Sequence, residues 1–120
     1  MNTVYTGRWG EQKAAEYLNR HGYKTVGMNY KCRMGEIDVI AENKTTVVFC
    51  EVKLRRSAAF AQAREFVTPA KQERLRTTAA VWLSQNETSK QPRFDVVEIY
   101  APNGPDESNY QINHIENAFE

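Results

Sequence analysis

The segment Thr45–Leu54 places the strongest constraint on the fold of this chain. Its centre, Val47-Val48-Phe49-Cys50, is a nearly continuous apolar run, which is typical of a strand covered on both faces by other elements. Glu51, Val52 and Lys53 follow directly. Because alternate residues of a strand share a face, Glu51 and Lys53 project together from the end of this strand. We therefore expect an α/β fold around a central strand that ends in charged side chains.

The rest of the chain supplies further strands and two helices. Apolar spacing predicts a helix from Gly7 to about His21, with Thr6 as its N-cap and Gly22 as the residue that ends it. A second helix is expected after the N-cap candidate Thr68, with proline at its first position. Strands are predicted over residues 23–30, 36–41, 93–100 and 110–115, and residues 57–67 fit a loop or a short helical turn. The order α-β-β-β-α-β-β predicts a small mixed β-sheet flanked by helices.

Length and composition favour a single domain over residues 1–120. Domains of about 100–150 residues are common, and the chain is 41% hydrophobic and 26% charged, as in ordinary soluble proteins. Its two cysteines lack metal-ligand spacing, so we expect reduced thiols and no zinc site. No stretch approaches the roughly 18 apolar residues that span a membrane, and residues 1–10 lack the apolar core of a signal peptide. We therefore expect a cytoplasmic protein without membrane contact.

The charge of the chain is unevenly distributed, although the net charge is only +1. Residues 53–76 hold seven basic and two acidic residues, a net charge of +5, whereas the rest holds nine basic and thirteen acidic residues and carries −4. Such asymmetry indicates a basic face for a polyanion beside an acidic remainder. A solvated helix surface would explain this feature equally well.

Asp38 lies on the strand before Glu51, and a short hairpin turn at residues 42–44 joins the two strands. Counting outward from the turn brings Asp38 opposite a residue between Phe49 and Glu51, to within a residue or two. Two neighbouring carboxylates repel, and one would hold a proton unless a cation lies between them. Mg²⁺ prefers oxygen ligands, so we expect a metal site at Asp38 and Glu51, with the backbone carbonyl of Val52 as a third ligand.

Lys53 would stand beside this metal. There it could orient an attacking water or neutralise charge that develops on a phosphate. Glu51 and Lys53 by themselves fit a surface salt bridge equally well, and Asp38 is the residue that favours the metal site.

Glu11 adds another acid to the predicted site. It shares a helical face with Ala14, Ala15 and Leu18, so it is expected to point inward at the end of an apolar stripe. The alternative is a glutamate near the helix start that complements the helix dipole. An acid on the inward face is less common, which favours the site.

Basic residues on and before the second helix form a predicted phosphate contact. Lys71 lies in line with Leu75 and Trp82, and Arg74 borders the same face. Phosphate contacts position nucleic acid whatever its sequence. The predicted nucleic-acid-binding set is Lys53, Arg55, Arg56, Arg64, Lys71 and Arg74. A solvated basic face remains the alternative. Arg93 and Asp95, which share a strand face, are given a structural role.

The spacing of Asp38 and Glu51-x-Lys53 resembles the signature of the PD-(D/E)xK nuclease superfamily. More of the chain is similar to a narrower group, the YraN-like family of small bacterial proteins described as predicted endonucleases. The similarity covers nearly the whole chain and rests on Gly10-Glu11, Ala14-Ala15, Tyr17-Leu18, Gly22-Tyr23, Asn29-Tyr30, residues 35–38, residues 49–53, Lys71, residues 93–97 and residues 114–119.

This resemblance implies a restriction-endonuclease-like fold similar to that of archaeal Holliday junction resolvases. It also implies metal and catalytic roles for Glu11, Asp38, Glu51 and Lys53. One departure is Ile37, which stands where the superfamily pattern has a proline.

The sequence therefore predicts an endonuclease that depends on Mg²⁺, which Mn²⁺ could replace, and that hydrolyses DNA, with branched or recombination intermediates as candidate substrates. A resolvase that makes paired cuts needs two sites, so a homodimer is expected under that interpretation only. Two alternatives remain open. One is a nucleic-acid-binding module of the same fold without turnover, and the other is a protein-interaction domain.

Overall fold

The computed structural model describes residues 3–56 and 67–120, with side chains from residue 7 onward in the first helix. Elements in these ranges follow the predicted order and confirm a mixed α/β fold whose sheet is flanked by two helices. They are α1 (Thr3–Arg20), β1 (Lys24–Cys32), β2 (Gly35–Glu42), β3 (Thr46–Arg55), α2 (Pro69–Gln85), β4 (Gln91–Tyr100) and β5 (Gln111–Phe119).

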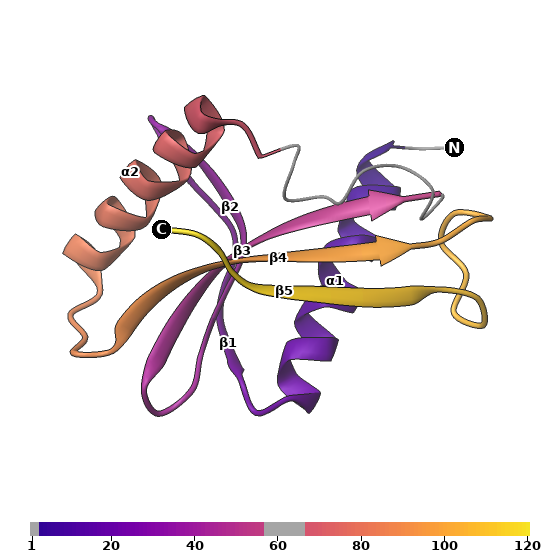
Figure 1. Cartoon of the computed structure of the whole chain (residues 1–120), viewed down its shortest axis with the longest axis horizontal. Coiled ribbons are helices and arrows are strands. Elements are labelled where there is room, and N and C mark those ends of the chain that lie inside the picture. The colour runs from indigo at the N-terminus through magenta and orange to yellow at the C-terminus, as the bar shows by residue number, and fades with distance from the viewer. Residues whose placement is uncertain (1–2, 57–66) are drawn as a thin grey trace.

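The strands form one sheet in the order β1-β2-β3-β4-β5 (Figure 1). Neighbouring strands are antiparallel except β3 and β4, which are parallel because α2 lies in the connection between them. β3 is the central strand, and Val47, Val48, Phe49 and Cys50 are all buried. The apolar run of the sequence thus becomes the middle of the sheet, as predicted.

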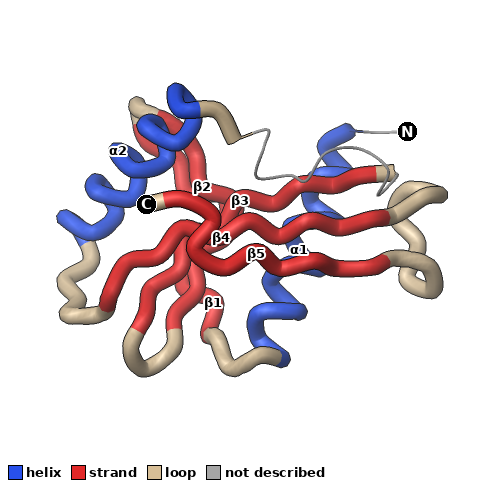
Figure 2. The backbone as a smooth tube through the Cα atoms, in the orientation of Figure 1, coloured by secondary structure: helices blue, strands red, loops and turns tan. Residues whose placement is uncertain are grey.

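Each face of the sheet carries its own hydrophobic core. Val48 and Cys50 pack with Trp9, Ala14 and Leu18 of α1. Their neighbours on β3, including Phe49, face the other way and pack with Leu75, Ala79 and Trp82 of α2. Figure 2 shows α1 behind the strands of the strongly twisted sheet and α2 at the left, in agreement with the two separate cores. β3 contributes side chains to both cores. The residues that follow its apolar run, Glu51 to Lys53, therefore lie near both helices.

The sequence predicted the end of α1 and the start of α2, but not the start of α1. α1 begins at Thr3, so the prediction that Thr6 is its N-cap was wrong. Its end is as expected, because Gly22 has a φ of 90° and the Tyr23 N–H donates to the Leu18 carbonyl. At the start of α2 the Thr68 side chain accepts a hydrogen bond from the Lys71 N–H, and proline occupies the first helical turn. Neither helix is both long and apolar enough to span a membrane.

Three strands extend at one end by two or more residues beyond the prediction. β1 runs on to Cys32, β5 to Phe119, and β4 begins at Gln91. Pro92 is tolerated in β4 because this part of the strand pairs with β3, while the pairing with β5 starts at Phe94. The ring of Phe119 stacks on that of Phe94, with centroids 5.0 Å apart, which holds the end of β5 in place. Residues 57–66, predicted as a loop or helical turn, lie outside the described residues.

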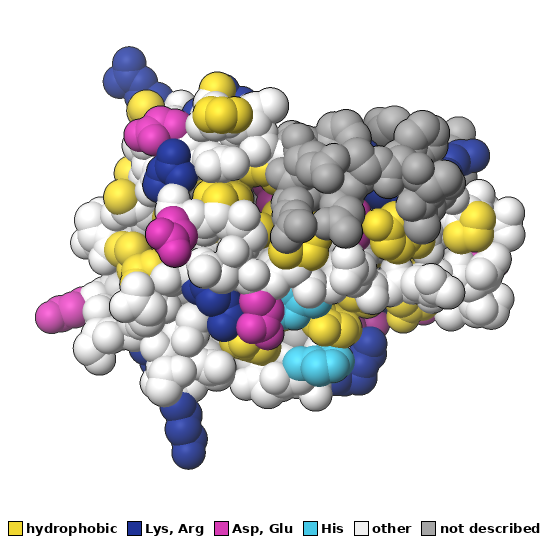
Figure 3. Space-filling model, in the orientation of Figure 1, with side chains coloured by type: hydrophobic (Ala, Val, Ile, Leu, Met, Phe, Trp, Pro, Cys, Tyr) yellow, Lys and Arg dark blue, Asp and Glu magenta, His cyan; other side chains and the backbone are white. Residues whose placement is uncertain are grey.

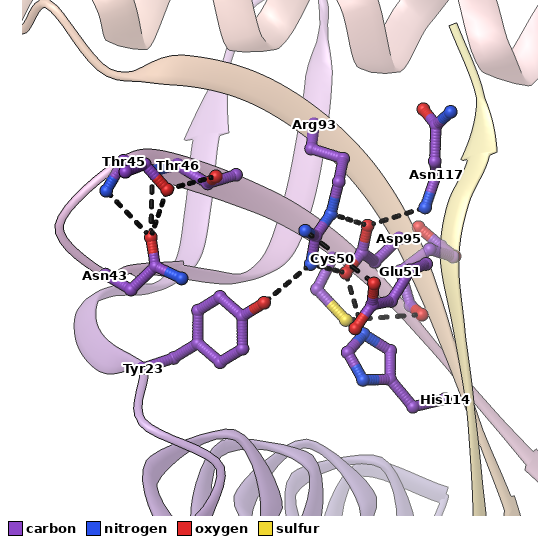
Figure 4. Close-up of polar contacts among 11 residues, drawn as sticks. Tyr23, Asn43, Thr45, Thr46, Cys50, Glu51, Arg93, Asp95, His114 and Asn117 are labelled. Atoms are coloured by element: carbon purple, nitrogen blue, oxygen red, sulfur yellow. Dashed lines mark hydrogen bonds and ion pairs between the residues drawn. The ribbon is translucent and has the colours of Figure 1, made fainter.

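A buried carboxylate joins β4 to β5 (Figure 4). The Asp95 side chain is fully buried, and it accepts hydrogen bonds of 2.8 Å from Arg93 Nε and Nη2 and of 3.0 Å from the Asn117 N–H. His114 Nε2 lies 2.7 Å from it. Burial disfavours its charge, but the contacts with His114, Arg93 and Asn117 outweigh burial and lower the pKa of Asp95. Arg93 and Asp95 thus have the predicted structural role.

Replacing Asp95 should therefore destabilise the fold. Asp95→Asn leaves the Arg93 guanidinium without its buried anionic partner, with only the more distant and exposed Glu116 at 3.9 Å, and breaking a buried ion pair in this way costs about 3–5 kcal/mol. Urea unfolding followed by circular dichroism measures the change in the free energy of unfolding. Glu87→Gln, in an exposed loop, is the matched control and should change it by less than about 0.5 kcal/mol. Equal unfolding midpoints for the two variants would contradict this role.

Candidate metal and nucleic-acid site

The register of β2 on β3 brings Asp38 beside Glu51. The paired residues are Ala41 with Val48, Ile40 with Phe49 and Val39 with Cys50. One step further in this register, Asp38 comes opposite Glu51. The Asp38 carboxylate accepts a 2.8 Å hydrogen bond from the Val52 N–H. Asp38 is thus fixed at the point where the pairing of the two strands ends.

Two more acids reach the same place. Glu36 alternates with Asp38 on β2, and Glu11 comes from α1. Carboxylate oxygens of Glu11, Glu36 and Asp38 all lie within 4.8 Å of one another. Asn29 of β1 orients Glu11 by donating a 2.7 Å hydrogen bond from its side-chain amide to Oε1. Acids from one helix and one strand therefore converge beside the end of the β2–β3 pairing.

This crowding changes the acid–base behaviour of the carboxylates. Burial raises the pKa of Asp38 to about 7, and the negative charges of Glu51, Glu11 and Glu36 add to the rise, whereas the Val52 N–H opposes it. Burial, followed by the charge of Glu36, also raises the pKa of Glu11. Without a cation, the acids cannot all be ionised at neutral pH at low cost.

Glu51 is buried, with 7% of its surface exposed, and it faces two lysines. Lys71 Nζ of α2 lies 2.7 Å from Glu51 Oε1, and Lys53 Nζ lies 3.6 Å from the same oxygen. Burial lowers the pKa of Lys53, helped by the charge of Lys71, and Glu51 only partly offsets this. Burial also acts to lower the pKa of Lys71, but its hydrogen bond to Glu51 and the negative charges of Glu51 and Asp38 together outweigh burial and raise this pKa. Both lysines thus belong to the site itself.

A cavity of about 180 Å³ opens beside these groups. Gly35 forms part of its wall, where the β1–β2 turn meets α2. A side chain there would place a Cβ 2.9 Å from the buried Thr78 Oγ1, so glycine is needed for this close approach. The cavity is lined by Gly35, Glu36, Asp38, Glu51, Lys71, Arg74 and Leu75. Acidic and basic groups of the site therefore face one solvent-accessible space.

Other residues of the predicted nucleic-acid-binding set are more scattered. Arg74 is exposed on α2 and lines the cavity. Arg55 lies at the end of β3, and its charge acts on Lys53. Arg56 is exposed and lines a separate pocket with Tyr100 and Gln111. Arg64 lies outside the described residues. The face drawn in Figure 3 mixes acidic and basic side chains, so it is not a uniformly basic surface.

Three site residues were missed or misplaced by the sequence-based prediction. Glu36 was overlooked as a ligand, although its two-residue spacing from Asp38 already put both on one face. Asn29, which contacts Glu11, was also missed. Its φ of 51° interrupts the regular geometry of β1, and the periodicity of the sequence does not predict such an irregularity. Lys71 was expected beside the site on a nucleic-acid face, but it pairs directly with Glu51.

The donor set fits a hard divalent cation. All the side-chain donors that converge are carboxylate oxygens, which suit Mg²⁺ or Mn²⁺. The Val52 carbonyl is also directed toward β2, because the N–H and C=O of one strand residue point to the same side. Glu11, Glu36 and Asp38 could hold such an ion, with Glu51 adjacent.

Comparison with known proteins identifies the family. The model of the uncharacterised protein family UPF0102 matches residues 10–99, a range that includes Glu11, Asp38, Glu51, Lys53 and Lys71. A UPF0102 protein of Caldanaerobacter subterraneus subsp. tengcongensis is 42% identical over 99% of this chain and 98% of its own length. Another, from Caldicellulosiruptor saccharolyticus, is 41% identical over 99% of this chain and 100% of its own length. The chain belongs to the UPF0102 family.

The raised pKa of Asp38 predicts how stability depends on pH. Between pH 3.8 and about 7 the unfolded chain loses this proton while the metal-free folded protein keeps it. Stability therefore falls as the pH rises through this window, by about 2–4 kcal/mol from this group. Asp38→Asn should remove this loss, so its melting temperature in EDTA at pH 8 should exceed that of the wild type.

The same melting experiment tests metal binding. Mn²⁺ at pH 8 should raise the melting temperature of the wild type and leave that of Asp38→Asn unchanged, because the variant lacks the carboxylate. Asp106→Asn alters an aspartate in the loop between β4 and β5, whose pKa is lowered by hydrogen bonds from Ser108, so this control should keep the wild-type response to Mn²⁺. A wild type that is more stable than Asp38→Asn in EDTA at pH 8 would contradict the assignment.

Proposed function

We propose that this protein is a metal-dependent endonuclease that hydrolyses DNA phosphodiester bonds. The observation that carries the proposal is the convergence of Glu11, Glu36 and Asp38. The pair of Glu51 with Lys53 lies next to them, and Glu36, Asp38 and Glu51 line an open cavity. Acids that crowd together, with a lysine at their edge, form an arrangement suited to a dication and a phosphate group. Acids from separate elements that lie together at a raised pKa destabilise a fold when no cation is bound, so a functional role is the better explanation for them.

The resemblance of the sequence to the PD-(D/E)xK nucleases supports the same activity. The four residues that the resemblance singled out, Glu11, Asp38, Glu51 and Lys53, come from α1, β2 and β3. The α-β-β-β-α-β-β order agrees with the restriction-endonuclease-like fold that the resemblance implies. Likeness to archaeal Holliday junction resolvases makes branched DNA the first substrate to test, and a homodimer would supply the two sites for paired cuts.

The roles of the side chains follow from their positions. A bound Mg²⁺ or Mn²⁺ would supply Lewis-acid activation of water and positive charge for the phosphate. Asp38 and Glu11, with Glu36 and Glu51 beside them, would hold the ion. Lys53 would orient the attacking water or stabilise charge that develops on the phosphate oxygens.

Basic residues around the cavity would contact neighbouring phosphates. Arg74 lines the cavity wall, and Arg55 lies beyond Lys53 on the same strand. Contacts from Arg56 and Arg64 remain predictions from the sequence, because Arg56 lines a separate pocket and Arg64 lies outside the described residues. Such contacts place DNA without reading its sequence, which fits the excess of positive charge between residues 53 and 76.

The proposal predicts cleavage that depends on Glu51. Linear, nicked, flapped and four-way DNA are incubated with the protein and Mg²⁺ or Mn²⁺, and products are resolved on denaturing gels. At least one substrate should be cut by the wild type, and EDTA should prevent the reaction. Glu51→Ala should reduce cutting to background, because the site loses a carboxylate, while binding of the same DNA in a gel-shift assay stays within about three-fold of wild type.

Glu87→Gln provides the control, since it removes one acid from an exposed loop away from the site, and it should cut like the wild type. DNA that is bound but never cut would favour a nucleic-acid-binding module without turnover. If neither metal nor DNA binds, a protein-interaction domain becomes the better explanation, and the endonuclease proposal fails.

A further inference from the structure

The ion pair between Lys71 and Glu51 suggests a second function for this lysine. We propose that Lys71 neutralises Glu51 in the metal-free protein and turns to a substrate phosphate when a dication binds beside Glu51. The inference rests on the proposed function, because it adds a phosphate-contacting residue to the same site. The role proposed for Lys71 differs from that of Lys53, which lies on the same strand as Glu51.

Two ammonium groups lie near the same carboxylate oxygen of Glu51. Lys71 Nζ is 2.7 Å from Oε1, whereas Lys53 Nζ is 3.6 Å from that oxygen. Lys53 stays close to Glu51 in any state, because the two residues project from the same face of β3. Lys71 comes from another element, so its contact can be broken without any change in the sheet.

The charge balance of the site explains why metal binding would break this contact. Glu11, Glu36, Asp38 and Glu51 contribute up to four negative charges, and Lys53 and Lys71 contribute two positive ones. A dication close to these acids supplies the missing positive charge, so Glu51 no longer needs Lys71. The dication and the Lys71 ammonium also repel each other at short range.

Lys71 can reach a phosphate without a change in the backbone. Its position is fixed in the first turn of α2, where its N–H donates to the Thr68 hydroxyl over 3.2 Å. Its side chain is 33% exposed and lines the cavity together with Arg74. Only the flexible side chain has to turn, and a phosphate in the cavity is an anion that both basic residues could contact.

Metal affinity provides the first test, and it does not depend on activity. Calorimetric titration with Mn²⁺ should show that Lys71→Met binds the ion about three- to ten-fold more tightly than the wild type, because a competing and repelling cation has been removed. Lys90→Met is the matched control, since Lys90 is also a partly exposed lysine paired with a glutamate, Glu42, at 3.1 Å. That control should stay within about two-fold of wild type.

Lys71→Gln serves as a second variant should Lys71→Met fold poorly. Its amide keeps a hydrogen-bond donor for Glu51 but carries no charge, and it should also bind Mn²⁺ more tightly than the wild type. Unchanged or weaker Mn²⁺ binding in a folded variant would overturn the proposal, because Lys71 would then merely position Glu51.

DNA binding provides the second test. A labelled four-way junction is titrated with protein in Ca²⁺, which occupies oxygen sites and is used here in place of Mg²⁺, and separately in EDTA. Lys71→Met should weaken binding about ten-fold in Ca²⁺ but less than about two-fold in EDTA, where Lys71 is held by Glu51. An equal loss in both conditions would contradict the switch. A wild type that binds Mn²⁺ and DNA yet cuts no substrate would refute the endonuclease proposal but not this inference.

Discussion

The position of the Asp38 carboxylate is the constraint on which the rest of the site depends. It is half-buried where the pairing of β2 with β3 ends, it accepts a hydrogen bond from the Val52 N–H, and it lies close to Glu11 and Glu36. A carboxylate in such surroundings is costly unless it holds a proton or faces a cation. Its pKa of about 7 expresses that cost, and natural proteins retain such strain mainly where function requires it.

The sheet explains how a chain of this size keeps these acids together. Val48 and Cys50 of β3 pack in the core under α1, and Val47 and Phe49 pack in the core under α2. The strand is thus held from both faces up to Cys50, and Glu51 and Lys53 follow without a break. α2 then brings Lys71 to Glu51 because it connects the parallel strands β3 and β4. One central strand thereby positions the charged groups from its neighbours.

The order of the elements and the nearness of Asp38 to Glu51 could be predicted from the sequence for a physical reason. Period-two alternation and a continuous apolar run are local signals, so β3, its neighbour β2 and the nearness of Asp38 to Glu51, to within a residue or two, followed from counting. The remaining contacts are long-range. Asn29 reaches Glu11 across 18 residues and Lys71 reaches Glu51 across 20, and no periodicity encodes such distances. α1 begins at Thr3, so Thr6 lies within the helix, and a capping preference is too weak a signal to fix where a helix begins.

The central claim is that the crowded acids form a site for a single dication. Anomalous diffraction from crystals soaked in Mn²⁺ tests it most directly, because the metal is then located independently of any activity. The expected result is one strong peak bonded to Asp38 and to at least one of Glu11, Glu36 and Glu51. A peak elsewhere, or the absence of a peak with these side chains placed as described, would contradict the claim.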